Sequence, residues 1–108
     1  KVRQRNGVSP NFVHSLDAAA LHKTVIKANK EEGIYDFAFI HDSYGTHATG
    51  CEALSKSLRN VFISTFSVDL LRDWKHQLEQ QTGLELPEPP EYGTADISKI
   101  KDSTYFFS

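Results

Sequence analysis

The stretch YDFAFIHDSYGTHA, residues 35–48, decides the fold that we expect for this chain. Its first half is aromatic and apolar without a helical period, which is typical of a mostly buried strand. Asp42 and Ser43 form a tight polar break, and residues 44–47 can return as a second, short strand. We therefore predict a β-hairpin over about residues 35–48, with Asp42 at its tip.

A helix is predicted before the hairpin, over about residues 15–32. Ser15 can act as its N-cap, and Asp17 falls in the first turn, where the helix dipole favours a carboxylate. Gly33 provides the stop signal. His22, on this helix, is interpreted as a solvated side chain, and phosphate contact is the alternative.

Two further helices are predicted after the hairpin. The first spans about residues 50–65, with a capping-box pattern formed by Thr49 and Glu52. The second begins near Ser67, places Leu71, Trp74 and Leu78 on one face and ends at Gly83. Trp74 is interpreted as a core residue. Cys51, in the first turn of the earlier helix, is interpreted as a packing residue.

The last quarter of the chain is predicted to be extended. Residues 84–93 contain three prolines and can form neither a helix interior nor a central strand, so they are expected to connect elements at the surface. Asp96 can cap one short turn through Ile100. Residues 105–107 are all aromatic, and we expect such an apolar terminus to be docked. The predicted fold class is therefore α+β, a hairpin packed against about three helices with an extended C-terminal tail.

Composition limits the classes of function. The 108 residues carry a net charge of −2, with 39% hydrophobic and 24% charged residues, which is ordinary for one globular domain. A stand-alone nucleic-acid binder usually has a basic excess, so any nucleic-acid contact would need further basic surface from elsewhere.

A single cysteine excludes an internal disulfide framework and favours a reducing compartment. No apolar run has the length of a membrane span, so no membrane partner is expected. Methionine is absent and the chain begins with Lys1, which indicates a fragment of a longer protein.

The hairpin tip is the candidate chemical site. A carboxylate at the bend of an apolar hairpin is held rigidly and still projects to where a substrate can reach it. Two-metal phosphoryl transfer uses such groups, and Mg²⁺ takes only one or two protein carboxylates beside water and phosphate oxygens. The pattern alone more often indicates an Asp42 that bonds its own backbone in a turn, beside a half-buried strand histidine at position 41.

The chain contains three separated motifs, PNFVHSLD at residues 10–17, HDSYGTHA at 41–48 and STYFFS at 103–108. Together, and in this order, they resemble the single-subunit RNA polymerases of bacteriophages and mitochondria. The resemblance covers nearly the whole chain from Gly7 onward. It implies that residues 1–108 are a C-terminal fragment of the polymerase catalytic domain, with the motif C hairpin at about 35–48 and the C-terminal foot at about 103–108.

The resemblance also implies roles for individual residues. Asp42 matches the second metal-binding aspartate of the palm, and His41 the histidine beside it that shapes the site. His14 matches a histidine near the primer–template end of the nucleic acid, and a structural histidine at the helix entry is an equally weighted alternative. The C-terminal foot, which packs back near the active site, is matched by Phe106, Phe107 and Ser108.

The implied reaction is DNA-directed RNA synthesis with two Mg²⁺ ions, and the implied partners are a DNA template, an RNA transcript and nucleoside triphosphates. The family's earlier palm aspartate and its fingers lysine and tyrosine are not found in this sequence. We therefore expect the 108-residue chain alone to be inactive, to bind Mg²⁺ weakly at best and to expose apolar surface that can drive self-association.

Alternatives and origin stay open at the level of sequence. Related DNA polymerases place Glu after the hairpin aspartate, where this chain has Ser43. A phosphohydrolase of the His-Asp type would need further metal ligands on helices, and a helical interaction module would leave the hairpin tip without a purpose.

Gly45 resembles the phage members of the family at this position, which indicates the cytoplasm of an infected bacterium. The STYFFS ending points toward the alternative, the mitochondrion.

Overall fold

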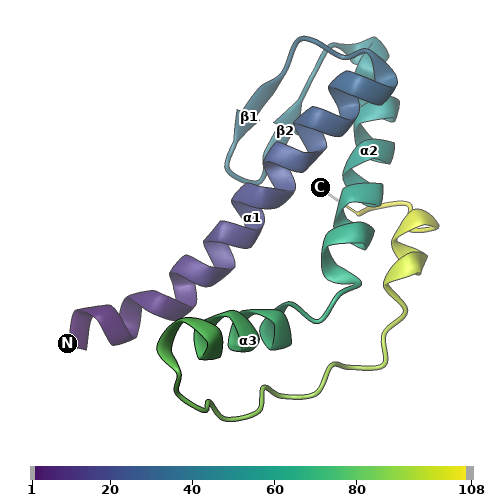
Figure 1. Cartoon of the computed structure of the whole chain (residues 1–108). Coiled ribbons are helices and arrows are strands. Elements are labelled where there is room, and N and C mark those ends of the chain that lie inside the picture. Colours follow the sequence, from purple (N-terminus) through teal and green to yellow (C-terminus); the bar gives the residue numbers. More distant parts are fainter. Residues whose placement is uncertain (1, 107–108) are drawn as a thin grey trace. The chain divides into compact units, whose positions relative to one another are not determined.

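A computed structural model describes residues 2–106 and confirms the α+β class (Figure 1). Within residues 2–106 the order is α1 (Val2–Glu32), β1 (Ala38–Ile40), β2 (Ser43–Gly45), the 3₁₀ helix η1 (Ala48–Gly50), α2 (Cys51–Phe66), α3 (Leu70–Thr82) and the 3₁₀ helix η2 (Ile97–Lys101). The chain forms two compact units, one through Phe62 and one from Ile63 onward, and each is described by itself. None of the helices in residues 2–106 has the length and apolarity needed to cross a membrane.

Helix α1 is much longer than predicted. It begins at Val2 rather than near residue 15, and Pro10 lies inside it. Proline removes one backbone hydrogen bond from a helix, but the Arg and Gln residues before it are good helix formers, and the helix continues through it. Ser15 is not an N-cap, because its Oγ donates to the Phe12 carbonyl at 2.6 Å inside the helix. The predicted end is correct, since Gly33 follows with φ 66°, the left-handed region that favours glycine.

Strands β1 and β2 form the predicted antiparallel hairpin. The register pairs Ala38 with Gly45, Phe39 with Tyr44 and Ile40 with Ser43. The two turn residues are therefore His41 and Asp42, and not Asp42 and Ser43 as expected. His41 is an exposed turn residue with φ 53°, so its interpretation as a half-buried strand histidine is wrong.

The core of the first unit joins the hairpin to α1 and α2 (Figure 1). Its centre is formed by Ala28, Ile34 and Leu54, and the partly buried residues packed against it are Phe37, Phe39, Tyr44 and Ala53. The Phe37 and Phe39 rings stack with centroids 5.2 Å apart. A large apolar side chain that is fully buried stabilises a fold by about 1.5–3 kcal/mol, so each of these partly buried aromatic side chains contributes less than that. The hairpin is thus held by its aromatic residues.

Small residues line the buried face of α1. Ala20, Thr24 and Ala28 are four residues apart, which puts them in one row, and their side chains are at most 1% exposed. Thr24 satisfies its buried hydroxyl by donating to the Ala20 carbonyl at 2.8 Å. Short side chains allow close packing of the helix, so this row fixes which face of α1 is left for solvent.

The start of α2 differs from the predicted capping box. Thr49 lies inside η1, whose N-cap is His47, and no side chain caps that turn. Cys51 is exposed, so its interpretation as a packing residue is wrong. Its Sγ donates weakly to the His47 carbonyl at 3.6 Å. The helix itself agrees with the prediction to within a residue.

Helix α3 lies in the second unit and is capped at both ends. Asp69, not Ser67, is the N-cap, because its carboxylate accepts from the Arg72 backbone N–H at 3.0 Å. Ser67 instead donates its hydroxyl to the Ile63 carbonyl in the last turn of α2. Gly83 ends the helix with φ 68°, as predicted. No described residue of α3 is fully buried, so Trp74 is half-buried and not a core residue.

Residues 84–93, which we name the proline strap, run along α3. The Leu86 backbone N–H donates to Glu79 Oε1 at 2.8 Å. Lys75 Nζ pairs with Glu79 at 3.5 Å and with Glu88 of the strap. After the strap, Asp96 caps η2 by accepting from the Ser98 N–H at 3.0 Å, as predicted.

The expectation of a docked aromatic terminus is wrong for Tyr105, which is 84% exposed. Phe106 is half-buried, and Phe107 and Ser108 lie outside the described residues. Apolar atoms contribute more than half of an ordinary protein surface, so the aromatic character of this segment did not require burial.

Candidate functional site

One cleft of the first unit gathers most of the residues that the sequence singled out. It has a volume of about 700 Å³ and is lined by His14, Asp17, Ala18, Leu21, His22, His41 and Asp42. Five of these residues come from α1 and two from the hairpin turn. The cleft therefore joins segments that are separated by about twenty residues of sequence.

The α1 wall of the cleft follows helical geometry. Its five residues lie at positions 14, 17, 18, 21 and 22, a spacing of three and four that places them on one face of a helix. Ala18 and Leu21 form an apolar strip between His14 and Asp17 at one end and His22 at the other. The buried row of α1 turns this polar face outward.

The opposite wall is the turn of the hairpin. His41 and Asp42 are exposed there, and the strands that carry them are held by a cross-strand aromatic pair. The Phe39 and Tyr44 rings meet edge to face with centroids 5.1 Å apart and planes at 79°. A carboxylate on so short a turn, anchored by aromatic packing, has little freedom to move away from the cleft.

Tyr44 connects this packing to the carboxylates of the cleft. Burial raises the pKa of its phenol, and the negative charges of Asp17 and Asp42 raise that pKa further. Both carboxylates thus act on the same hydroxyl, which stays protonated at neutral pH. Asp17 and Asp42 belong to one electrostatic site although they lie on different elements.

The metal-binding side chains of the described residues do not form a complete metal site. Among residues 2–106, no group of three or more His, Cys, Asp or Glu side chains is placed to hold a metal ion. Mg²⁺ typically takes one or two protein carboxylates and fills its remaining positions with water and phosphate oxygens. Asp42, exposed at the turn, is suited to supply one such ligand to an ion whose other ligands come from elsewhere.

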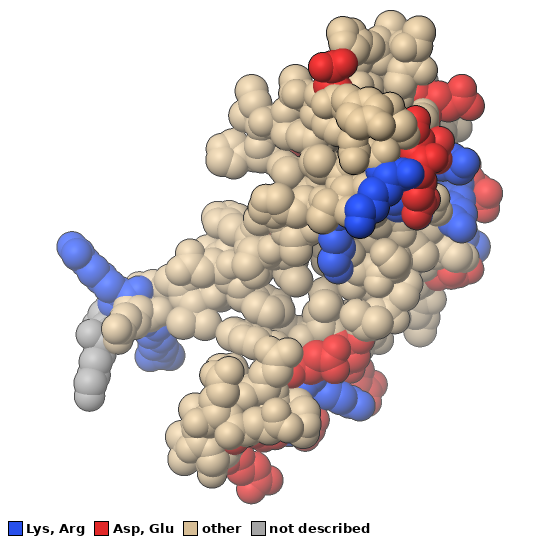
Figure 2. Space-filling view, turned by 45° about the horizontal axis from the view of Figure 1, so that its top comes forward, with Lys and Arg blue, Asp and Glu red and all other residues tan. Residues whose placement is uncertain are grey.

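The charge of the cleft is mixed. Its lining contains two carboxylates and three imidazoles, and no lysine or arginine is among the residues that line it. On the face shown in Figure 2, acidic and basic side chains are likewise interspersed and do not form one broad basic field. This agrees with the net charge of −2 and indicates that phosphate attraction is not the main property of this surface.

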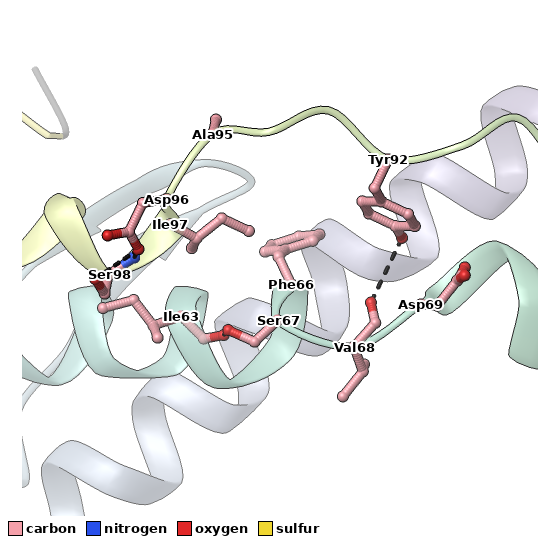
Figure 3. Close-up of a pocket in the computed structure, with 10 residues that line it drawn as sticks. All are labelled: Ile63, Phe66, Ser67, Val68, Asp69, Tyr92, Ala95, Asp96, Ile97 and Ser98. Carbon is pink, nitrogen blue, oxygen red and sulfur yellow. Dashed lines mark hydrogen bonds between the residues drawn. The ribbon is translucent and has the colours of Figure 1, made fainter.

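A second cleft, in the other unit, does not have this chemistry. It measures about 390 Å³ and is lined mainly by residues near the α2–α3 turn, the end of the strap and η2 (Figure 3). The Tyr92 hydroxyl accepts from the Leu70 N–H at 3.2 Å and donates to the Val68 carbonyl at 3.4 Å. Asp69 and Asp96 are engaged as helix caps. Its polar groups thus close the fold of the second unit.

The structure brings together three of the residues that the sequence selected, namely His14, His41 and Asp42. The cleft also contains Asp17 and His22. The sequence had indicated only a favourable interaction with the helix dipole for Asp17 and a solvated side chain for His22. Their spacing from His14 was the signal that could have found them, since residues three and eight positions along a helix share its face. Phe106 of the foot is half-buried in the other unit.

The family model of DNA-dependent RNA polymerase matches residues 1–84. The chain therefore belongs to the DNA-dependent RNA polymerase family, and its relatives include the phage-type, single-subunit enzymes that the sequence motifs resemble.

Individual relatives agree with this membership. DNA-directed RNA polymerase 1A of Nicotiana tabacum is 39% identical over 98% of this chain, which corresponds to 68% of that relative. The mitochondrial DNA-directed RNA polymerase 1B of Nicotiana tabacum is 39% identical, and the match covers 98% of this chain and 10% of the relative. T7 RNA polymerase of Escherichia phage T7 is 36% identical over 98% of this chain and 13% of its own length. The chain thus spans about a tenth of the latter two proteins. No solved structure matches the chain.

Proposed function

We propose that this chain forms part of the active centre of a DNA-directed RNA polymerase. The reaction is nucleotidyl transfer, in which the RNA 3′-hydroxyl attacks the α-phosphorus of a nucleoside triphosphate and pyrophosphate leaves. The observation that carries the proposal is the cleft in which Asp42 and His41 of the hairpin turn face His14 of α1. Family membership supplies the reaction class.

Each of the three residues has a distinct role in this proposal. Asp42 offers the carboxylate that would hold Mg²⁺, and the bound metal would stabilise the attacking and leaving oxygens of the transfer. His41, fixed at φ 53° in the turn, shapes the position of the neighbouring carboxylate. His14, on the opposite wall, contacts the end of the RNA–template hybrid.

The partners in this proposal are a DNA template, the RNA transcript and nucleoside triphosphates. One carboxylate at the turn does not complete a two-ion site. The chain therefore requires the earlier palm aspartate and nucleotide-binding residues from outside these 108 residues. Phe106, Phe107 and Ser108 are proposed as a C-terminal foot. The place of action that we propose is the cytoplasm of an infected bacterium, on the basis of Gly45, and the mitochondrion is the alternative.

The decisive test is Asp42→Asn in the complete polymerase. The amide keeps the size of the side chain and removes the charge that would hold the metal. Nucleotide incorporation should fall by roughly a hundredfold or more, because transition-state charge stabilisation is lost, and promoter binding should be retained. Asp73→Asn is the matched control, an exposed carboxylate in the first turn of α3 outside the cleft. Activity of the Asp42 variant within about tenfold of the parent would reject the role, since one lost metal ligand costs more than that.

The same proposal predicts that the 108-residue chain alone is inactive. Incorporation of labelled nucleotide on a primed template is the measurement, with the complete polymerase as the positive control. Template-dependent incorporation by the isolated chain would show that the site is complete without further ligands, and would contradict the proposal.

A further inference from the structure

The α1 wall of the cleft presents one side chain whose chemistry the proposed function does not yet use. Asp17 lies between His14, one turn earlier, and His22, which is five residues later on the same face. Its carboxylate is exposed and faces a cleft of about 700 Å³. The neighbouring Ala18 and Leu21 carry no polar groups, so Asp17 is the one anionic group on this wall.

An ionised carboxylate only accepts hydrogen bonds. No lysine or arginine lines the cleft to pair with this carboxylate, so it is available to accept a hydrogen bond from a ligand that carries a donor. A phosphate oxygen is an acceptor and carries negative charge, and a carboxylate repels it. Among the parts of a nucleic-acid strand, hydroxyl groups of the sugar and amino groups of the bases remain as donors.

These two donors, the sugar hydroxyl and the base amino group, differ in whether a contact to them depends on the base sequence. In the minor groove only guanine offers an amino group, so a contact to it would make binding depend on the sequence. Every nucleotide of an RNA strand has a 2′-hydroxyl, which the wide, shallow minor groove of an A-form helix displays. A contact to the 2′-hydroxyl therefore suits a polymerase that copies templates of any sequence.

We propose that Asp17 accepts a hydrogen bond from a ribose 2′-hydroxyl of the RNA strand lying in this cleft, and so makes the site prefer RNA over DNA at that position. The inference rests on the proposed function, since it requires a nucleic-acid strand in the cleft. The flanking imidazoles of His14 and His22 each offer a donor and an acceptor to neighbouring sugar oxygens. Asp17 is thereby a specificity-determining residue.

The test compares two primers of the same sequence, one of RNA and one of DNA, each annealed to one DNA template. Their dissociation constants from the complete polymerase are measured by fluorescence anisotropy, without nucleotide. The ratio of the two constants is the readout, because loss of the Asp17 charge reduces repulsion of both primers equally and cancels in the ratio.

The parent should prefer the RNA primer. Asp17→Ala should lower this preference by about ten- to a hundredfold, the usual contribution of one hydrogen bond to a charged acceptor. Asp17→Asn should retain part of the preference, since its amide oxygen can still accept. Asp73→Ala, at an exposed carboxylate outside the cleft, should leave the ratio unchanged. A primer with a single 2′-deoxy substitution at the contacted nucleotide should reproduce the loss in the parent and have no further effect in Asp17→Ala.

An unchanged ratio in Asp17→Ala, with circular dichroism like that of the parent, would overturn the inference. A primer in which inosine replaces guanosine removes the base amino group, and a loss of binding confined to that primer would assign Asp17 to the bases and also overturn it. A parent that binds neither primer would instead refute the proposed function. The two failures are therefore distinguishable.

Discussion

Phe39 and Tyr44 face each other across the hairpin, with ring centroids 5.1 Å apart and planes at 79°. They are a register pair, one strand position away from the His41–Asp42 turn on either side. Edge-to-face aromatic pairs contribute about 0.5–1.5 kcal/mol beyond the burial of their area. The geometry of the proposed catalytic turn therefore depends on an apolar contact beneath it.

Two substitutions of Tyr44 should distinguish the contribution of its ring to stability from that of its hydroxyl group. Tyr44→Phe keeps the ring, so we expect the free energy of unfolding to change by less than about 0.5 kcal/mol. Tyr44→Ala removes a partly buried ring and should cost about 2 kcal/mol. Urea denaturation followed by circular dichroism measures both. Tyr35→Ala, at a ring 79% exposed, is the control and should be nearly neutral. Equal losses for the Phe and Ala variants of Tyr44 would mean that the hydroxyl, not the ring, holds the hairpin.

The turn itself should carry backbone strain. His41 has φ 53°, a left-handed conformation that costs an L-residue about 1–2 kcal/mol. His41→Gly should therefore raise the free energy of unfolding by up to about 1 kcal/mol. Thermal unfolding of the chain is the measurement, and the complete polymerase carrying the same change should lose activity. A destabilised His41→Gly chain would show that the imidazole makes contacts that outweigh the strain.

The elements that could be predicted from sequence are those with local stop signals. Gly33 and Gly83 end α1 and α3 in the left-handed conformation, and Asp96 caps η2 as its position before a short turn suggested. The hairpin was correct in place because an aromatic run without a helical period has few alternatives. These assignments depend on residues close to one another in sequence.

The errors arise where local patterns compete. Ser15 and Ser67 are both common cap residues, but each donates its hydroxyl to a carbonyl of the preceding helical turn, the alternative that serine always has. The predicted start of α1 near residue 15 was wrong because the helix begins at Val2 and continues through Pro10. In the site, Asp17 and His22 were missed because their importance depends on what α1 faces, which is a property of tertiary structure.

One buried hydroxyl offers a stabilising substitution. Ser57 is 1% exposed, and its Oγ has no hydrogen-bond partner in the described part of the chain. An unsatisfied buried hydroxyl costs about 1–3 kcal/mol. Ser57→Ala should therefore raise the free energy of unfolding by about 1 kcal/mol. Ser55→Ala, on the exposed face of α2, is the control and should change it by only a few tenths. Destabilisation by Ser57→Ala would indicate that a buried water satisfies the hydroxyl.

Acid should weaken η2 through its cap. The side-chain hydroxyl of Ser98 and then its backbone N–H stabilise the charged form of Asp96 and lower its pKa. A folded-state pKa below the unfolded value means that the contribution is present above the unfolded pKa and is lost as the pH falls through the folded one. We expect the protection of the Ser98 amide against hydrogen exchange to decline below a pH of about 4.

Asp96→Asn retains a good N-cap and removes the titration, so its protection should not depend on pH in that range. Asp102→Asn, at the other end of η2, is the control and should keep the decline of the parent. A decline that persists in Asp96→Asn would assign the acid sensitivity to another carboxyl group.

Removing the charge of Lys75 should weaken the attachment of the proline strap to α3. Lys75 neutralises Glu79, which accepts the Leu86 N–H, and it also pairs with Glu88. Contact with Lys75 lowers the pKa of Glu88, so the pair persists into mildly acidic solution. Lys75→Met keeps most of the length of the side chain and leaves both carboxylates without their partner. Trp74, which shares a groove with the strap prolines, should then show a red-shifted fluorescence maximum.

Limited proteolysis within residues 84–93 should be about two- to fivefold faster in Lys75→Met, because exposed ion pairs contribute only modestly. Lys99→Met in η2, where no ion pair to the strap is formed by the described residues, should be cleaved at the parent rate. High salt should accelerate cleavage of the parent and have little effect on Lys75→Met, since only the parent has these pairs to screen. Salt sensitivity that survives the substitution would mean that apolar packing of the prolines, and not Lys75, holds the strap on α3.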